Sequence, residues 1–178
     1  YSRRDPHTVY QPRTGVPVES LRGAEVLAAS REPGRGAGRG AVRVIIPPLD
    51  QPGYDTMTPE RQREVHDRFD REREQLAREI LERQLQVVLV TPMTTPEFVA
   101  LMRLLRQFGG AIVTARGGAN SHGAIVGREM NVSVLVGAGP AVFEQLQPDM
   151  EVTVEANIGR VFKGLLLIDP NMGENVDT

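Results

Sequence analysis

The chain of 178 residues contains no cysteine and no tryptophan, and only one of its 21 basic residues, Lys163, is a lysine. The lack of cysteine excludes disulfide bonds, thiolate nucleophiles and cysteine-ligated metals. It is also compatible with a reducing compartment, and we expect a cytoplasmic protein. Because no apolar run reaches the roughly 18 residues that cross a bilayer, and no secretory signal is present, we expect no membrane partner.

Aromatic residues are scarce, with three Tyr and five Phe. Proteins that bind single-stranded nucleic acids stack bases on aromatic side chains, so this scarcity argues against a nucleic-acid partner. We interpret the strong preference for arginine over lysine as arginine-biased codon usage, although the rigid fork of donors on the guanidinium group also suits contacts with phosphate or carboxylate groups.

Length and composition are those of one globular domain, with 40% hydrophobic and 25% charged residues. Residues 1–22 mix proline, arginine and polar residues without periodicity, which predicts an N-terminal arm or linker. We expect the domain at 23–168 and a flexible tail at 169–178. Since the first residue is Tyr rather than Met, we expect a fragment or a processed product.

Apolar strand-like runs alternate with helical patterns through the middle of the chain, and hairpins flank them. This order predicts an α/β domain with a mixed sheet. The predicted strands are 24–29, 41–46, 86–90, 111–113, 132–136, 150–154, 160–162 and 165–168. The predicted helices are 60–85, one that Thr94 or Thr95 caps, one that begins near Ser121, and 141–146.

A glycine-rich segment, GRGAGRG at 34–40, lies between the first two strands. Its backbone N–H groups could surround a phosphate, but the spacing differs from a P-loop and no Lys-Ser/Thr pair follows. We therefore predict a flexible hairpin or turn.

The helix at 60–85 has strong boundary signals and an unusual surface. Thr58 is a candidate N-cap and Pro59 follows it at the first position. Its apolar residues form a narrow stripe, and charged residues cover its other faces. Such a stripe suits packing on another helix, and a homo-oligomer that assembles through 60–85 is one possibility. His66 lies beside the stripe and is interpreted as a solvated residue.

The stretch TARGGANSHGAIVGRE, residues 114–129, carries the candidate chemistry. A buried strand precedes it, Gly117 and Gly118 interrupt regular structure, and a helical run begins after Ser121. The unpaired N–H groups of a helix start attract anions, and glycines let the backbone approach a phosphate. Ser121 could cap the helix or donate to a phosphate oxygen. Neutral imidazole is nucleophilic, so His122 is a candidate for attack on a phosphoryl group.

This stretch, followed by NVSVLVGAG and PDMEVTVEANIGRVFKG, resembles the mobile phosphohistidine domain of phosphoenolpyruvate-utilising enzymes. That family includes pyruvate phosphate dikinase, phosphoenolpyruvate synthase, enzyme I of the sugar phosphotransferase system and rifampicin phosphotransferase. The shared pattern is a Thr, a Gly-Gly, a Ser-His, a small pair, an aliphatic pair and an Arg-Glu. VVLVTPMTTPEF at 87–98 also resembles the segment that precedes this motif, and the helix at about 58–85 looks like an insertion.

The resemblance implies a swivelling β/β/α unit whose histidine carries a phosphoryl group between sites on other domains. His122 would be the carrier, and Gly117, Gly118, Ser121 and Gly123 would shape its phosphate pocket. We expect no metal or cofactor on this chain. Mg²⁺ with ATP or phosphoenolpyruvate is expected on partner domains, ATP-grasp-like or phosphoenolpyruvate-binding, in cis or in trans. The alternative is a non-catalytic structural or protein-interaction module that assembles through 60–85.

Overall fold

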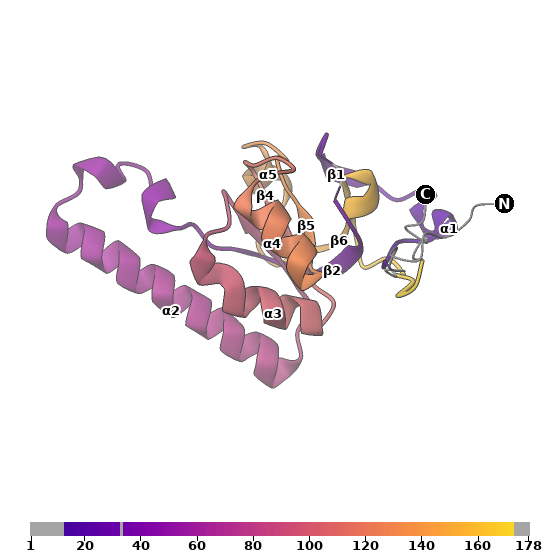
Figure 1. Ribbon diagram of the computed structural model, residues 1–178, viewed down its shortest axis with the longest axis horizontal. Helices are drawn as coiled ribbons and strands as arrows, with labels where there is room; N and C mark the ends of the chain where they lie inside the picture. The colour runs from indigo at the N-terminus through magenta and orange to yellow at the C-terminus, as the bar shows by residue number, and fades with distance from the viewer. Residues whose placement is uncertain (1–12, 33, 173–178) are drawn as a thin grey trace, which may run out of the picture.

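A computed structural model describes residues 13–32 and 34–172 and shows a seven-stranded mixed sheet with helices packed on it (Figure 1). The α/β class and the mixed sheet are therefore confirmed. The sheet order is β1-β7-β6-β2-β3-β4-β5. The strands are β1 (Val26–Ala29), β2 (Ala37–Val44), β3 (Val87–Thr91), β4 (Ala111–Thr114), β5 (Ser133–Leu135), β6 (Glu151–Glu155) and β7 (Arg160–Lys163).

Strand β2 joins two halves of the sheet that differ in direction. β2, β3, β4 and β5 run parallel to their neighbours, whereas β2 pairs antiparallel with β6, β6 with β7 and β7 with β1. The carboxyl ends of the four parallel strands therefore lie along one edge. Ligands of α/β sheets commonly bind beyond that edge.

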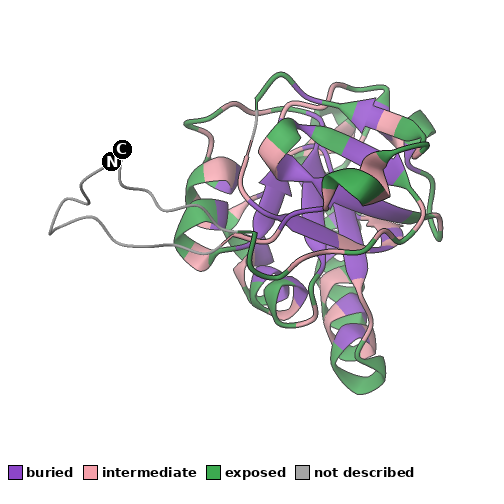
Figure 2. Ribbon diagram, turned by 90° about the vertical axis from the view of Figure 1, so that its right-hand side faces the viewer, coloured by how far each residue is buried: buried purple, intermediate pink, exposed green. Residues whose placement is uncertain are grey.

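The helices are α1 (Val18–Leu21), α2 (Pro59–Arg83), α3 (Val99–Gln107), α4 (His122–Met130) and α5 (Val142–Gln145). Short 3-10 turns lie at Pro48–Asp50, Tyr54–Thr56, Pro96–Phe98 and Ala156–Ile158. Side chains of α2, α3 and α4 pack with one face of the parallel strands, and α5 and the β6–β7 hairpin contribute to the cluster on the other face. Figure 2 shows the buried strands at the centre, with the exposed residues on the outward faces of the helices.

The glycine-rich segment is not the flexible turn that the sequence predicted, because β2 begins at Ala37 and runs through most of it. Glycine is required there by close neighbouring backbones. A Cβ on Gly38 would lie 2.1 Å from the carbonyl oxygen of Gly110, and one on Gly40 would lie 2.2 Å from that of Gln86. Glycine inside a strand often marks such an approach.

The long helix begins as expected. Thr58 is the N-cap, and its hydroxyl accepts a hydrogen bond of 3.2 Å from the backbone N–H of Arg61. The apolar stripe of α2 is buried within the chain, where it packs on α3 and the segment before it (Figure 1). The rings of Phe69 and Phe98 meet edge to face at 5.5 Å, and the guanidinium of Arg73 lies 4.4 Å above the Phe69 ring.

The predicted strand at 165–168 is wrong. These residues leave the sheet after β7, and only Asp169 pairs, through an isolated bridge to Gly15. A strand needs a neighbouring edge, and β7 already lies between β6 and β1. The end of the predicted arm also packs on the domain, since Val16 is buried and its N–H donates to Glu155 Oε2 at 2.6 Å.

Residues 1–12, which include His7, and 173–178 lie outside the described residues. No helix in the described part of the chain is long and apolar enough to cross a membrane.

Candidate functional site

The site lies at the carboxyl edge of the parallel strands, where the loop after β4 leads into α4. Backbone hydrogen bonds tie this loop to both neighbours. The N–H of Ala115 donates to the carbonyl oxygen of Thr91, the last residue of β3, at 3.2 Å, and the N–H of Arg116 donates to that of Pro92, directly after β3, at 3.0 Å. On the other side, the N–H of Ala138 donates to Thr114 O at 2.9 Å. The chain that presents the histidine is therefore held by β3 and β5.

Gly117 and Gly118 have different structural requirements. Gly117 has φ +111°, where side chains are strained, and a Cβ there would lie 3.1 Å from Ser121 Oγ. Gly118 has no positive φ, and its added Cβ would meet only Glu32 Oε1 at 3.8 Å. Gly117 is thus needed for the turn itself, whereas Gly118 leaves open space beside it.

Ser121 caps α4. Its φ and ψ are −70° and 158°, and its hydroxyl accepts a hydrogen bond of 3.3 Å from the N–H of Ala124. Accepting uses a lone pair and leaves the hydroxyl proton available to donate. Both roles that the sequence left open for Ser121 are therefore compatible in this geometry.

His122 is the first residue of α4 and its side chain is exposed. No hydrogen bond or ion pair joins its ring to any other described residue. The backbone N–H groups of His122 and Gly123 precede the first intrahelical acceptor and meet no acceptor within 13–32 and 34–172. An exposed imidazole thus stands beside unused donors at the positive end of a helix.

Thr94 is a site residue that the sequence did not identify. It is 3% exposed, and its Oγ1 has no hydrogen-bond partner in the described structure. A Cβ on Gly123 would lie 2.5 Å from this oxygen, so the hydroxyl rests against the first turn of α4. Gly123 therefore faces Thr94 and is buried. A buried hydroxyl without a partner costs about 1–3 kcal/mol, so the Thr94 hydroxyl has an unused capacity to donate at the first turn of α4.

The sequence signal at Thr94 was ambiguous because Thr94 and Thr95 both precede a proline. We expected one of them to cap the next helix. Thr95 does occupy the N-cap position of the 3-10 turn that leads into α3, but its side chain makes no cap hydrogen bond. Only the folded chain shows that Thr94 lies under α4.

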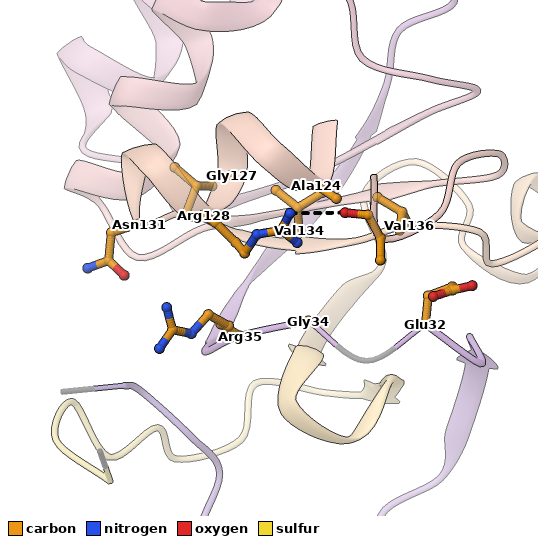
Figure 3. Close-up of a pocket in the computed structure, with 11 residues that line it drawn as sticks. Glu32, Gly34, Arg35, Ala124, Gly127, Arg128, Asn131, Val134 and Val136 are labelled. Atoms are coloured by element: carbon orange, nitrogen blue, oxygen red, sulfur yellow. Dashed lines mark hydrogen bonds between the residues drawn. The ribbon is translucent and has the colours of Figure 1, made fainter. Parts of the chain in front are cut away.

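Two arginines brace the loop that carries the histidine. Arg116 pairs with Asp50 at 2.9 Å, which links the loop to the 3-10 turn Pro48–Asp50. Arg128, near the end of α4, donates a hydrogen bond of 3.0 Å to the carbonyl oxygen of Ala119 (Figure 3). The second contact ties the loop before α4 to the last turns of the same helix.

A cavity of about 140 Å³ lies along α4, between this helix and the segment before β2 (Figure 3). Ala124, Arg128 and Val136 line one side of it, and Glu32 and Arg35 line the other. His122 is outside this lining. Among the described residues, no three His, Asp or Glu side chains are close enough together to hold a metal ion.

Comparison with known proteins gives a consistent result for the second half of the chain. The family model described as "PEP-utilising enzyme, mobile domain" matches residues 84–159, a segment that begins directly after α2. A probable phosphoenolpyruvate synthase of Staphylothermus marinus is 43% identical over 79 residues, which is 44% of this chain and 9% of that protein. The phosphoenolpyruvate synthase of Neisseria meningitidis is 43% identical over 82 residues, which is 44% of this chain and 10% of that protein.

Among solved structures, the solution structure titled Enzyme I (nEIt) aligns with 27% identity and a TM-score of 0.35, covering 49% of this chain and 32% of that one. The two synthases are much longer proteins, and this chain matches only about a tenth of their length.

Proposed function

Since residues 84–159 belong to the mobile-domain family of phosphoenolpyruvate-utilising enzymes, we propose that this chain is a phosphohistidine carrier module of a phosphotransferase or dikinase. In this proposal His122 accepts a phosphoryl group from a donor on another domain and passes it to an acceptor. The proposal includes a cytoplasmic location. The observation that carries it is the exposed, uncommitted imidazole at the first position of α4.

The transfer that we propose uses the ring as a nucleophile. A nitrogen lone pair of neutral His122 attacks the phosphorus atom of the donor, an N–P bond forms, and the P–O bond to the leaving group breaks. An acceptor then attacks the same phosphorus, the N–P bond breaks, and the neutral imidazole is restored. The proposed donors are ATP or a phosphoenolpyruvate-type compound.

The groups around the ring would stabilise the negative charge of the phosphoryl oxygens. The N–H groups of His122 and Gly123 are unused donors at the positive end of α4. The hydroxyl protons of Ser121 and Thr94 are two more candidates, and the space beside Gly118 would let the phosphate approach. Donors already in position for a developing charge need no reorganisation during the reaction.

Other domains would complete the cycle, because the chain matches only about a tenth of its curated relatives. They would hold the nucleotide or phosphoenolpyruvate with Mg²⁺, in cis in a longer protein or in trans.

The experiment that tests the proposal measures transfer of labelled phosphate. The chain is mixed with a phosphoenolpyruvate synthase from which the mobile domain has been deleted, together with Mg²⁺ and either ATP labelled with ³²P at both the β- and γ-phosphates or ³²P-labelled phosphoenolpyruvate. We expect label on the chain that is stable in alkali and lost in acid, and none on His122→Ala. His66→Ala is the matched control, since His66 is exposed on α2 and bonds Tyr54, and it should label normally. Equal labelling of His122→Ala and the natural chain would refute the carrier role.

The alternative is an interaction module that assembles through helix 60–85. The observation that favours it is the length of α2, whose outward faces carry many charged residues and the exposed Leu81. Its apolar stripe is already buried on α3, so a homo-oligomer would have to use these outward faces.

A further inference from the structure

A second pocket lies at the opposite edge of the sheet from His122. It has a volume of about 340 Å³ and opens beside the starts of β2, β4 and β5, where Ala37, Gly110 and Ser133 line it. His122 follows the carboxyl ends of the same parallel strands. Four strand residues separate the two edges by about 13 Å, so the two regions are distinct.

Three arginines from different parts of the chain line this pocket: Arg13 before α1, Arg35 before β2, and Arg106 in the last turn of α3. No acidic residue is among the described residues that line it. Neither Arg13 nor Arg106 makes an ion pair with another described residue. Figure 3 shows that the guanidinium of Arg35 and the amide of Asn131 lie at the same end of the neighbouring cavity, away from Glu32, and both residues also line this pocket.

A simpler explanation is that these arginines neutralise the partial negative charges at the carboxyl-terminal ends of nearby helices. α3 ends at Gln107 and α4 at Met130, and both carboxyl-terminal ends lie near the pocket. A helix end carries a partial charge of about −0.5, so the two ends offset roughly one of the two guanidinium charges of Arg13 and Arg106. A positive charge of about one remains from this pair alone, and the other polar side chains that line the pocket are Thr14, Asn131 and Ser133, which carry groups able to donate hydrogen bonds.

We propose that this pocket is an anion site for a small molecule with two or more phosphate or carboxylate groups. Arginine pairs with both groups through two parallel N–H bonds, and convergent guanidinium groups suit multivalent anions better than monovalent ones. The volume fits such a ligand, since small-molecule pockets start at about 300 Å³. The site is independent of the phosphoryl carrier role of His122.

The test is calorimetric titration of the whole chain with pyrophosphate and, in a second arm, with citrate, which separates phosphate from carboxylate ligands. Acetate at matched ionic strength is the monovalent control. We expect saturable binding of at least one polyanion that weakens as salt is raised. The double variant Arg13→Gln/Arg106→Gln should bind at least about tenfold more weakly, because it removes two charges that donate hydrogen bonds to the anion.

The matched control is Arg22→Gln/Arg103→Gln, which removes the same charge from two exposed arginines outside the pocket, one of them also on α3. It should bind within about threefold of the natural chain, since distant charges are screened. His122→Ala should bind like the natural chain. Equal loss in both double variants, or no saturable binding of either polyanion, would overturn the proposal.

An NMR titration of the natural chain avoids dependence on a variant that fails to fold. Pyrophosphate or citrate should shift the amide signals of Gly36, Gly109, Gly110 and Ser133 first. Larger shifts at 121–124 than at these four residues would place the anion at the helix start instead, and the proposed pocket would be wrong.

Discussion

At the residue scale, the first turn of α4 combines an exposed imidazole with a buried hydroxyl that has no partner. His122 stands on the outside of this turn, and Thr94 touches its inside next to Gly123. Folded proteins rarely leave a buried hydroxyl unpaired unless a ligand or a functional state uses it. The same contact explains why residue 123 has no side chain, since any Cβ would collide with Thr94.

Replacing Thr94 by valine should separate stability from function. Valine keeps the shape and removes an unpaired hydroxyl, so the free energy of unfolding should stay the same or rise by up to about 1 kcal/mol. The rate of phosphoryl transfer to His122 should fall about tenfold if the hydroxyl binds the phosphoryl oxygens. Thr91→Val is the control, because Thr91 is equally buried and unpaired but belongs to β3. Unfolding by urea and the ³²P transfer assay give the two readouts, and equal slowing by both variants would contradict this role.

Gly117 and Gly118 should differ sharply when each is replaced by alanine. Gly117→Ala should lower the free energy of unfolding by about 1–3 kcal/mol, because φ is +111° and Ser121 lies within 3.2 Å of the added Cβ. Gly118→Ala should change it by less than about 0.5 kcal/mol, since its Cβ meets open space. Urea titration of both variants checks the difference, and similar losses would show that the loop has another conformation.

At the element scale, α2 is fixed to the sheet by its apolar stripe and by an ion pair between Arg43 and Glu79. Arg43 on β2 contacts Glu79 of α2 at 2.7 Å, and both side chains are about 70% buried, with exposures of 29% and 27%. The hydrogen bond from Arg43, reinforced by its positive charge, lowers the pKa of the Glu79 carboxyl. The folded state therefore holds this carboxylate ionised at a pH where the unfolded chain begins to protonate it.

This shift gives the ion pair a defined pH dependence. Its contribution is fully present above the pKa of an unfolded glutamate, about 4.3, and is lost as the pH falls through the lower pKa of the folded state. Glu79→Gln should thus lower the free energy of unfolding at pH 7 by about 0.5 kcal/mol. The difference from the natural chain should vanish in acid below that folded pKa. Glu74→Gln, at an exposed position of the same helix, is the control and should show no such trend.

Sequence patterns predicted the elements unequally, for physical reasons. The N-cap of α2 was predicted correctly as Thr58, and the helix begins at Pro59, one residue before the predicted range 60–85, because Thr58-Pro59 is a local capping signal that needs no tertiary information. The start of β2 was missed, because Gly38 and Gly40 are required by close contacts with backbone segments that are distant in the sequence. The element that covers the apolar stripe of α2 could not be predicted for the same reason. Hydrophobic periodicity shows which face of a helix is buried, but it does not show which element packs on that face.

At the scale of the whole molecule, the α/β class and the mixed sheet followed from the alternation of patterns along the chain. The order of the strands in the sheet could not be predicted in this way. β2 pairs with both β3 and β6, and no local sequence pattern indicates that β6 pairs with the free edge of β2. The position of His122 at the helix start was predictable, whereas Thr94 and the three-arginine pocket required the folded chain to bring distant segments together.

Sedimentation velocity separates the two candidate functions at this scale. With the apolar stripe of α2 buried on α3, the carrier proposal predicts a monomer at micromolar concentration in about 150 mM salt. The interaction-module alternative predicts a dimer or larger species that uses the outward charged faces of α2. Reversing the charge of Glu72 and Glu74 to lysine should then dissociate that species and leave a monomer unaffected.

The most direct measurement maps the phosphoryl group itself. The chain is incubated with Mg²⁺, ATP or phosphoenolpyruvate and the synthase that lacks its mobile domain, then digested at alkaline pH and sequenced by mass spectrometry. The synthase's own mobile domain, added back, shows that the donor is active. We predict one phosphoryl group per chain, attached to His122. A phosphoryl group on Ser121 or elsewhere, or none while the added-back domain is phosphorylated, would contradict the account.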